Sequence, residues 1–132
     1  MKEIWANIEG YGGKYQVSTW GRVRSISTST AKILKPYKNH KGYFKVGLMK
    51  DGRSNKHRVN RLVAQAFIPN WGNLPEVNHK DGNKANNSVT NLEWVSGREN
   101  RLYDRLEEAR WEDNVRIAAV ARYHFPETEQ SE

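Results

Sequence analysis

Short stretches of alternating apolar and polar residues fill the first half of the chain. Such alternation predicts half-buried strands. We expect four of them, over residues 15–18, 22–26, 42–49 and 56–59. In the third, Phe44, Val46 and Leu48 lie on one face, and Lys45 lies on the other. Because Asp51-Gly52 predicts a hairpin turn, we expect one small antiparallel sheet with an apolar side and a basic side.

After residue 59 the apolar spacing lengthens from two residues to three or four, which predicts a short helix. Asn60 is placed to be its N-cap, and Pro69 follows its end. Its apolar positions are Leu62, Val63, Ala66 and Phe67. We expect this helix to cover the apolar side of the sheet.

The second half predicts two further strands and a helix, over residues 74–79, 92–95 and from about residue 97. Asp81-Gly82 is a turn signal, and Ser96 with Glu99 forms a capping box. The helix would bury Leu102, Leu106 and Ala109, and residues 111–132 would form a helical extension with a polar tail. The sequence predicts an α+β fold, divided into residues 1–58, 59–110 and 111–132.

Charge is distributed unevenly along the 132 residues. The net charge is +7, but residues 1–65 hold 14 Lys or Arg against 3 acids, and residues 66–132 hold 8 against 12. A basic half interleaved with aromatic residues is typical of a nucleic-acid partner. The candidate DNA contacts are Arg22, Arg24, Lys45, Lys56, Arg58 and Arg61. A solvated basic face and an RNA-binding surface are the alternatives.

The composition excludes several classes of protein and of chemical site. The chain has no Cys, which excludes disulfides, Cys-ligated zinc and thiol nucleophiles. It has no run of about 20 apolar residues, as a membrane span requires, and no apolar signal-peptide core. We therefore expect a cytoplasmic protein with no membrane partner.

Asparagine is concentrated between residues 70 and 100, where eight occur. Three polar residues lie at the ends of predicted elements: His79 ends a strand, Asn91 precedes the next strand, and Asn100 lies in the first turn of the helix. A hairpin followed by a helix would place these three side chains on one face. That face could hold a hydrated divalent cation against a phosphate.

These motifs bear a resemblance to a known family. The stretches VNHKDGNKANN at 77–87, NLEWV at 91–95 and Glu99-Asn100 resemble the HNH endonucleases of the phage homing type. Upstream, Trp5, Gly10-Tyr11 and residues 15–18 and 21–25 are similar to the DNA-associated module that often precedes such nuclease domains. The helix at 61–67 also resembles the family.

The resemblance implies roles for individual residues. His79 would be the general base, because a neutral imidazole with an unperturbed pKa of about 6.5 is available near pH 7. Asn78 and Asn100 would hold Mg²⁺ or Mn²⁺ in a ββα-metal unit, and Asn91 would brace the loop that orients His79. The partner would be double-stranded DNA in the cytoplasm of a phage-infected bacterium. Both a monomer and a homodimer are compatible with the sequence.

Two positions depart from the family pattern. Position 78 is Asn where a carboxylate would be the stronger ligand, so we expect weak metal binding in the absence of DNA. Position 60 is Asn where relatives commonly have His. These departures support the alternative function, a DNA-binding protein that retains the scaffold but cleaves poorly or not at all.

Overall fold

The computed structural model describes residues 1–27 and 29–102. Its first sheet has four antiparallel strands in the order β1-β2-β3-β4. These strands are β1 (Trp5–Asn7), β2 (Tyr15–Ser18), β3 (Val23–Ile26) and β4 (Ala31–Ile33). The alternation at 15–18 and 22–26 therefore predicted β2 and β3 correctly, whereas β1 and β4 were not predicted.

A second sheet contains β5 (Tyr37–Lys38), β6 (Phe44–Lys50) and β7 (Arg53–Arg58). The Asp51-Gly52 turn is confirmed, because Lys50 pairs with Arg53 and both turn residues have positive φ. The expectation of a single sheet was wrong. Lys35-Pro36 separates β4 from β5, and proline has no N–H with which to continue a ladder.

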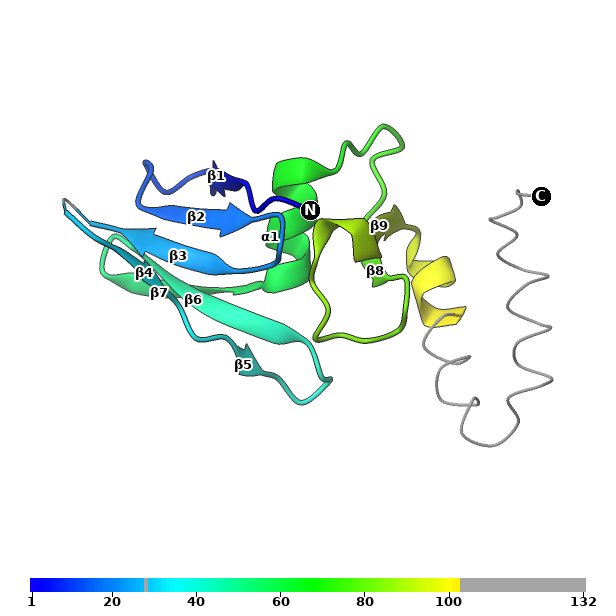
Figure 1. Ribbon diagram of the computed structural model, residues 1–132. Coiled ribbons are helices and arrows are strands. Elements are labelled where there is room, and N and C mark those ends of the chain that lie inside the picture. Colours follow the sequence, from blue (N-terminus) through cyan, green and yellow to red (C-terminus); the bar gives the residue numbers. More distant parts are fainter. Residues whose placement is uncertain (28, 103–132) are drawn as a thin grey trace.

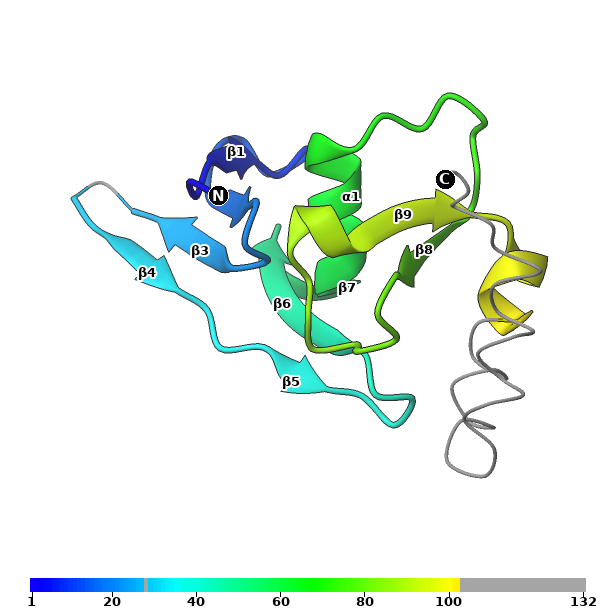
Figure 2. The ribbon, with the colours of Figure 1, turned by 45° about the vertical axis from the view of Figure 1, so that its right-hand side comes forward.

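Helix α1 (Val59–Phe67) lies at the centre of the described chain, between the sheets (Figures 1 and 2). It buries Val59, Leu62, Val63 and Ala64, whereas Ala66 is exposed, contrary to expectation. Asn60 is not the N-cap, because that position belongs to Arg58.

The side chain of Asn60 instead lies inside the first turn, at 3% exposure. It donates from Nδ2 to the carbonyl of Val77 at 3.2 Å and accepts the backbone N–H of Arg61 at 2.9 Å. Asn60 therefore ties α1 to the following strand, two residues before His79.

The third sheet pairs β8 (Glu76–His79) with β9 (Leu92–Val95), and the 3₁₀ turn η1 (Val89–Asn91) precedes β9. Helical backbone follows at residues 97–102. The capping box is confirmed: Ser96 N–H donates to Glu99 at 3.0 Å, and Glu99 N–H donates to the Ser96 hydroxyl at 3.2 Å. The expectations for Leu106, Ala109 and residues 111–132 lie outside the described residues.

One hydrophobic core connects all three sheets. Val17 and Val23 from the first sheet join Leu48 from the second, together with Val63 of α1 and Leu92 of β9. Within residues 1–27 and 29–102, no helix is long and apolar enough to cross a membrane.

Candidate active site

Asn91 braces the loop between β8 and β9. Its Nδ2 donates to the Asp81 carboxylate and to the carbonyl of Asn86, both at 2.9 Å, and its Oδ1 accepts the Asp81 N–H at 3.1 Å. Burial acts to raise the pKa of Asp81, but hydrogen bonds from Asn86, Asn83 and Asn91 outweigh it, so the pKa lies below its ordinary value. The ionised carboxylate therefore holds the loop closed at neutral pH.

His79 ends β8 and is 4% exposed. Its Nε2 lies 2.7 Å from Oδ1 of the buried Asn87. Since an amide oxygen only accepts hydrogen bonds, Nε2 is the donor, and in the neutral form of the ring the lone pair is then on Nδ1. In that neutral form Nδ1 is the ring atom that can accept a proton.

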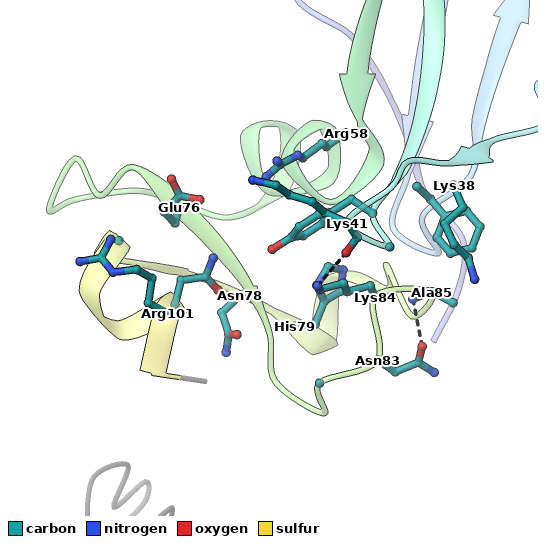
Figure 3. A pocket seen from close by; sticks show the side chains of 16 residues that line it. Lys38, Lys41, Arg58, Glu76, Asn78, His79, Asn83, Lys84, Ala85 and Arg101 are labelled. Carbon is teal, nitrogen blue, oxygen red and sulfur yellow. Dashed lines mark hydrogen bonds between the residues drawn. The ribbon is translucent and has the colours of Figure 1, made fainter. Parts of the chain in front are cut away.

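A cavity of about 880 Å³ opens beside this histidine, and we call it the main cavity. His79, Asn78 and Asn100 all line it, and Figure 3 shows His79 and Asn78 on its wall. The imidazole of His79 and the carboxamide of Asn100 therefore line the same cavity. Asn91 does not line the main cavity, because its side chain is directed into the loop.

Asn78 is held by its cross-strand neighbour Glu93. The Asn78 Nδ2 donates to the Glu93 carboxylate at 3.0 Å. This bond identifies the nitrogen side of the amide, so the Oδ1 atom remains as the group of Asn78 that can coordinate a cation.

Positive charge surrounds the main cavity. Of the described residues that line it, one is acidic and five are basic: Lys38, Lys41, Arg58, Lys84 and Arg101. The Arg58 guanidinium lies 4.1 Å and the Lys84 ammonium 4.5 Å from the centre of the buried Tyr43 ring. The centre of this ring lies 6.1 Å from that of the His79 ring. Tyr43 thus holds two cations beside the imidazole, where they would attract a phosphate.

A second cavity, of about 260 Å³, collects four of the six predicted DNA contacts. Its basic lining consists of Lys45, Lys56, Arg58 and Arg61, with His57 among them. Burial lowers the pKa of His57, and the charge of Lys45 lowers it further, so the lysines and arginines supply the positive charge. Arg58 lines both cavities and therefore makes the basic surface continuous.

Arg22 and Arg24 lie elsewhere, on the first sheet. Both stack on Trp5, at 5.6 and 4.0 Å, which confirms that they share a face. Arg22 also forms an ion pair with Glu3, donating from Nε at 2.8 Å. These two arginines line neither of the cavities described above.

Two family models match the chain. The NUMOD4 motif matches residues 3–49, and the HNH endonuclease model matches residues 57–102. This chain belongs to the HNH endonuclease family. The second match contains the four residues predicted for the site, which are Asn78, His79, Asn91 and Asn100.

Known HNH proteins resemble it over most of its length. DNA endonuclease I-HmuI of Bacillus phage SP01 is 46% identical over 92 residues, or 70% of this chain and 52% of that protein. H-N-H endonuclease F-TflII of Escherichia phage T5 is 31% identical over 71% of this chain and 49% of its own. The chain thus spans about half the length of these relatives.

A solved structure agrees with the fold. The structure described as DNA binding and cleavage by the HNH homing endonuclease I-HmuI matches with a TM-score of 0.68 at 37% identity. The match covers 90% of this chain and 66% of that chain.

The HNH site contains residues that sequence reasoning missed. Asn87, Glu93 and Lys84 each contact or line the site, but none was given a role of its own. Tyr43 was expected only as one of the aromatic residues interleaved with the basic half. Glu93 could have been found from the register of the hairpin, because residues 78 and 93 pair across it. Asn87 is the last residue of the family-like stretch at 77–87, but no spacing or strand register in the sequence pairs it with His79.

A hard divalent cation fits the oxygen donors of the HNH site. Among the described residues, no group of three or more His, Asp or Glu side chains could hold a metal ion without other ligands. The amide oxygens of Asn78 and Asn100 line the main cavity, as does the carboxylate of Glu76, with space beside them for water and phosphate. Such a donor set suits Mg²⁺ or Mn²⁺, which retain several waters.

Proposed function

We propose that this protein is a metal-dependent DNA endonuclease that hydrolyses phosphodiester bonds. The observation that carries the proposal is that His79, Asn78 and Asn100 line one cavity, together with lysine and arginine side chains, in a chain of the HNH family. In this proposal residues 1–58 contact DNA and residues 59–110 form the nuclease domain.

His79 acts as the general base. Its hydrogen bond to Asn87 fixes the tautomer, and the lone pair on Nδ1 takes the proton from the attacking water. Arg58 and Lys84, held on the ring of Tyr43, would bind phosphate oxygens and keep the scissile group beside the imidazole. Asn91 keeps the loop in place through Asp81.

Asn78 and Asn100 would hold the cation, Mg²⁺ or Mn²⁺. When bound, it stabilises negative charge on the scissile phosphate and on the departing oxygen. Because both ligands are neutral amides, we expect tight binding only when a DNA phosphate completes the site.

Duplex DNA would follow the basic surface from the main cavity across Arg58 to Lys45, Lys56 and Arg61. On the first sheet, Arg22 and Arg24 would make further backbone contacts after Arg22 exchanges its ion pair with Glu3 for one with a phosphate. In this proposal all six candidate residues contact the DNA backbone and position the duplex.

A nicking assay tests the proposed function. Supercoiled plasmid incubated with the protein and Mg²⁺ or Mn²⁺ should give open circles or linear DNA, and EDTA should abolish the reaction. Retained DNA binding without cleavage in either metal would instead support the alternative, a non-cleaving DNA-binding protein, which the neutral residue at position 78 favours.

Salt dependence tests the DNA path. Lys45→Ala should weaken duplex binding and lower the slope of log K against log salt by about 0.9, the value for one phosphate contact. Lys14→Ala is the matched control, because Lys14 is exposed and lines neither cavity. Equal slopes for Lys45→Ala and the wild type, measured by fluorescence anisotropy, would move the path away from the second cavity.

A further inference from the structure

The turn between β2 and β3, at residues 19–21, lies directly against the loop that holds His79. We propose that this turn is a built-in part of the nuclease site: it sets the position of Asn87, and Asn87 is a positioning residue for the His79 imidazole. The inference rests on the proposed function and extends it to the N-terminal module, which would orient the general base as well as contact DNA.

Gly21 makes the closest contact between the two parts. A Cβ atom at this position would lie 2.7 Å from the carbonyl oxygen of Asn87 and 2.8 Å from its Cβ. Real Cβ atoms do not approach backbone so closely, and the φ of +88° at Gly21 also disfavours a side chain. Only glycine lets the turn pack at this distance.

A backbone hydrogen bond fixes the same contact. The N–H of Val89 donates to the carbonyl of Thr19 at 2.9 Å, two residues after Asn87. Asn87 is 8% exposed and Thr19 is 6% exposed, so the interface excludes water. The loop is thus tied to the turn two residues after Asn87.

The turn is rigid enough to act as a support. The hydroxyl of Ser18, which is fully buried, accepts the N–H groups of Trp20 and Arg22, both at 3.2 Å. Thr19 N–H donates to the carbonyl of Ile4 at 2.9 Å, which anchors the turn to the N-terminal segment.

A continuous path of contacts therefore leads from the first sheet to the imidazole. Gly21 lies against the backbone carbonyl and Cβ of Asn87, and the side-chain Oδ1 of Asn87 lies 2.7 Å from His79 Nε2. Displacing Asn87 would release the ring from the orientation and tautomer that this bond selects. Residues 57–102, which the HNH model matches, do not contain this support.

The test compares two glycine substitutions in the full chain. Gly21→Ala introduces both an unfavourable φ and the contact with Asn87, whereas Gly13→Ala introduces a similar φ of +81° with no atom within 4 Å. Gly21→Ala should lower the single-turnover cleavage rate at saturating protein about 10- to 100-fold, because small misplacements of a reacting group cost that much. Gly13→Ala should stay within about twofold of wild type, and DNA affinity should be unchanged in both.

A second readout reports on the ring without any metal or cleavage. The ¹⁵N shifts of His79 should show a hydrogen on Nε2 in the wild type and in Gly13→Ala, and a mixture of tautomers in Gly21→Ala. Asn87→Ala should reproduce both changes and decides the matter if Gly21→Ala does not fold, as judged by thermal melting. Wild-type rates and wild-type His79 shifts in Asn87→Ala would overturn the inference.

The two proposals fail in different ways. If the wild-type protein does not cleave DNA, the proposed function fails, yet the ¹⁵N shifts still test the support of His79. If it cleaves and Gly21→Ala matches Gly13→Ala in rate and shifts, the support is disproved and the nuclease stands.

Discussion

His79→Ala is expected to lower the rate of DNA cleavage by about 10²- to 10⁴-fold, the range that a positioned general base contributes. His79 lines the main cavity beside Asn78 and Asn100, and its Nε2 is hydrogen-bonded to Asn87. Alanine cannot accept the proton of the attacking water. DNA affinity should change little, because the cations that surround the cavity remain.

The measurement is single-turnover cleavage of labelled duplex, with binding followed by anisotropy. His40→Ala is the matched control, since His40 is exposed and lines neither cavity. Because His79 is buried, the melting temperature of the variant must show that it remains folded at the assay temperature. A folded His79→Ala protein that cleaves at the wild-type rate would remove His79 from the mechanism.

The candidate residues of the site could be named from the sequence because they are local in sequence. His79, Asn91 and Asn100 lie within 22 residues, on a hairpin and the helix that follows it, and such short units have few possible geometries. Family resemblance supplied the roles, and the structure places His79 and Asn100 on one cavity. Asn91 was expected on the same face, but the loop is long enough to enclose its side chain.

The supports of the site were not predictable in the same way. Asn87 reaches His79 only because Gly21, 66 positions earlier, leaves room for its loop. Asn60 has the sequence signature of an N-cap, but its side chain is buried against Val77 of a strand that packs on α1. Long-range packing decides such contacts, and the spacing of apolar and polar residues along the chain does not predict them.

The same distinction applies to the fold. The β6–β7 hairpin was predicted because its turn and its alternating faces are adjacent in sequence. The division of the N-terminal strands into two sheets was missed because β4 and β5 are short and exposed, with no apolar face to mark them. Their pairing with β3 and β6 depends on backbone hydrogen bonds rather than on side-chain pattern.

Asn100→Ala should reduce cleavage at a fixed Mg²⁺ concentration by at least about 100-fold, because even the outer partners of metal ligands contribute 10- to 100-fold. Of the two amide oxygens available to the cation, this substitution removes one. Asn78→Asp should act in the opposite direction, since a carboxylate binds a hard cation better than an amide does. We expect the Mg²⁺ concentration for half-maximal cleavage to fall about tenfold in Asn78→Asp combined with Glu93→Gln.

The second substitution in that pair is required by the hydrogen bond between positions 78 and 93. Asn78→Asp alone would place a carboxylate where the Asn78 Nδ2 donates to Glu93, and two like charges at 3.0 Å repel. Adding Glu93→Gln restores a donor for this contact and keeps one negative charge in the pair. Metal titrations of cleavage, with Asn55→Ala on the exposed face of β7 as control, measure both effects. If Asn100→Ala has the same Mg²⁺ requirement as the wild type, the cation lies elsewhere in the cavity. If the Asn78→Asp, Glu93→Gln variant has an unchanged Mg²⁺ requirement, position 78 is excluded as a ligand.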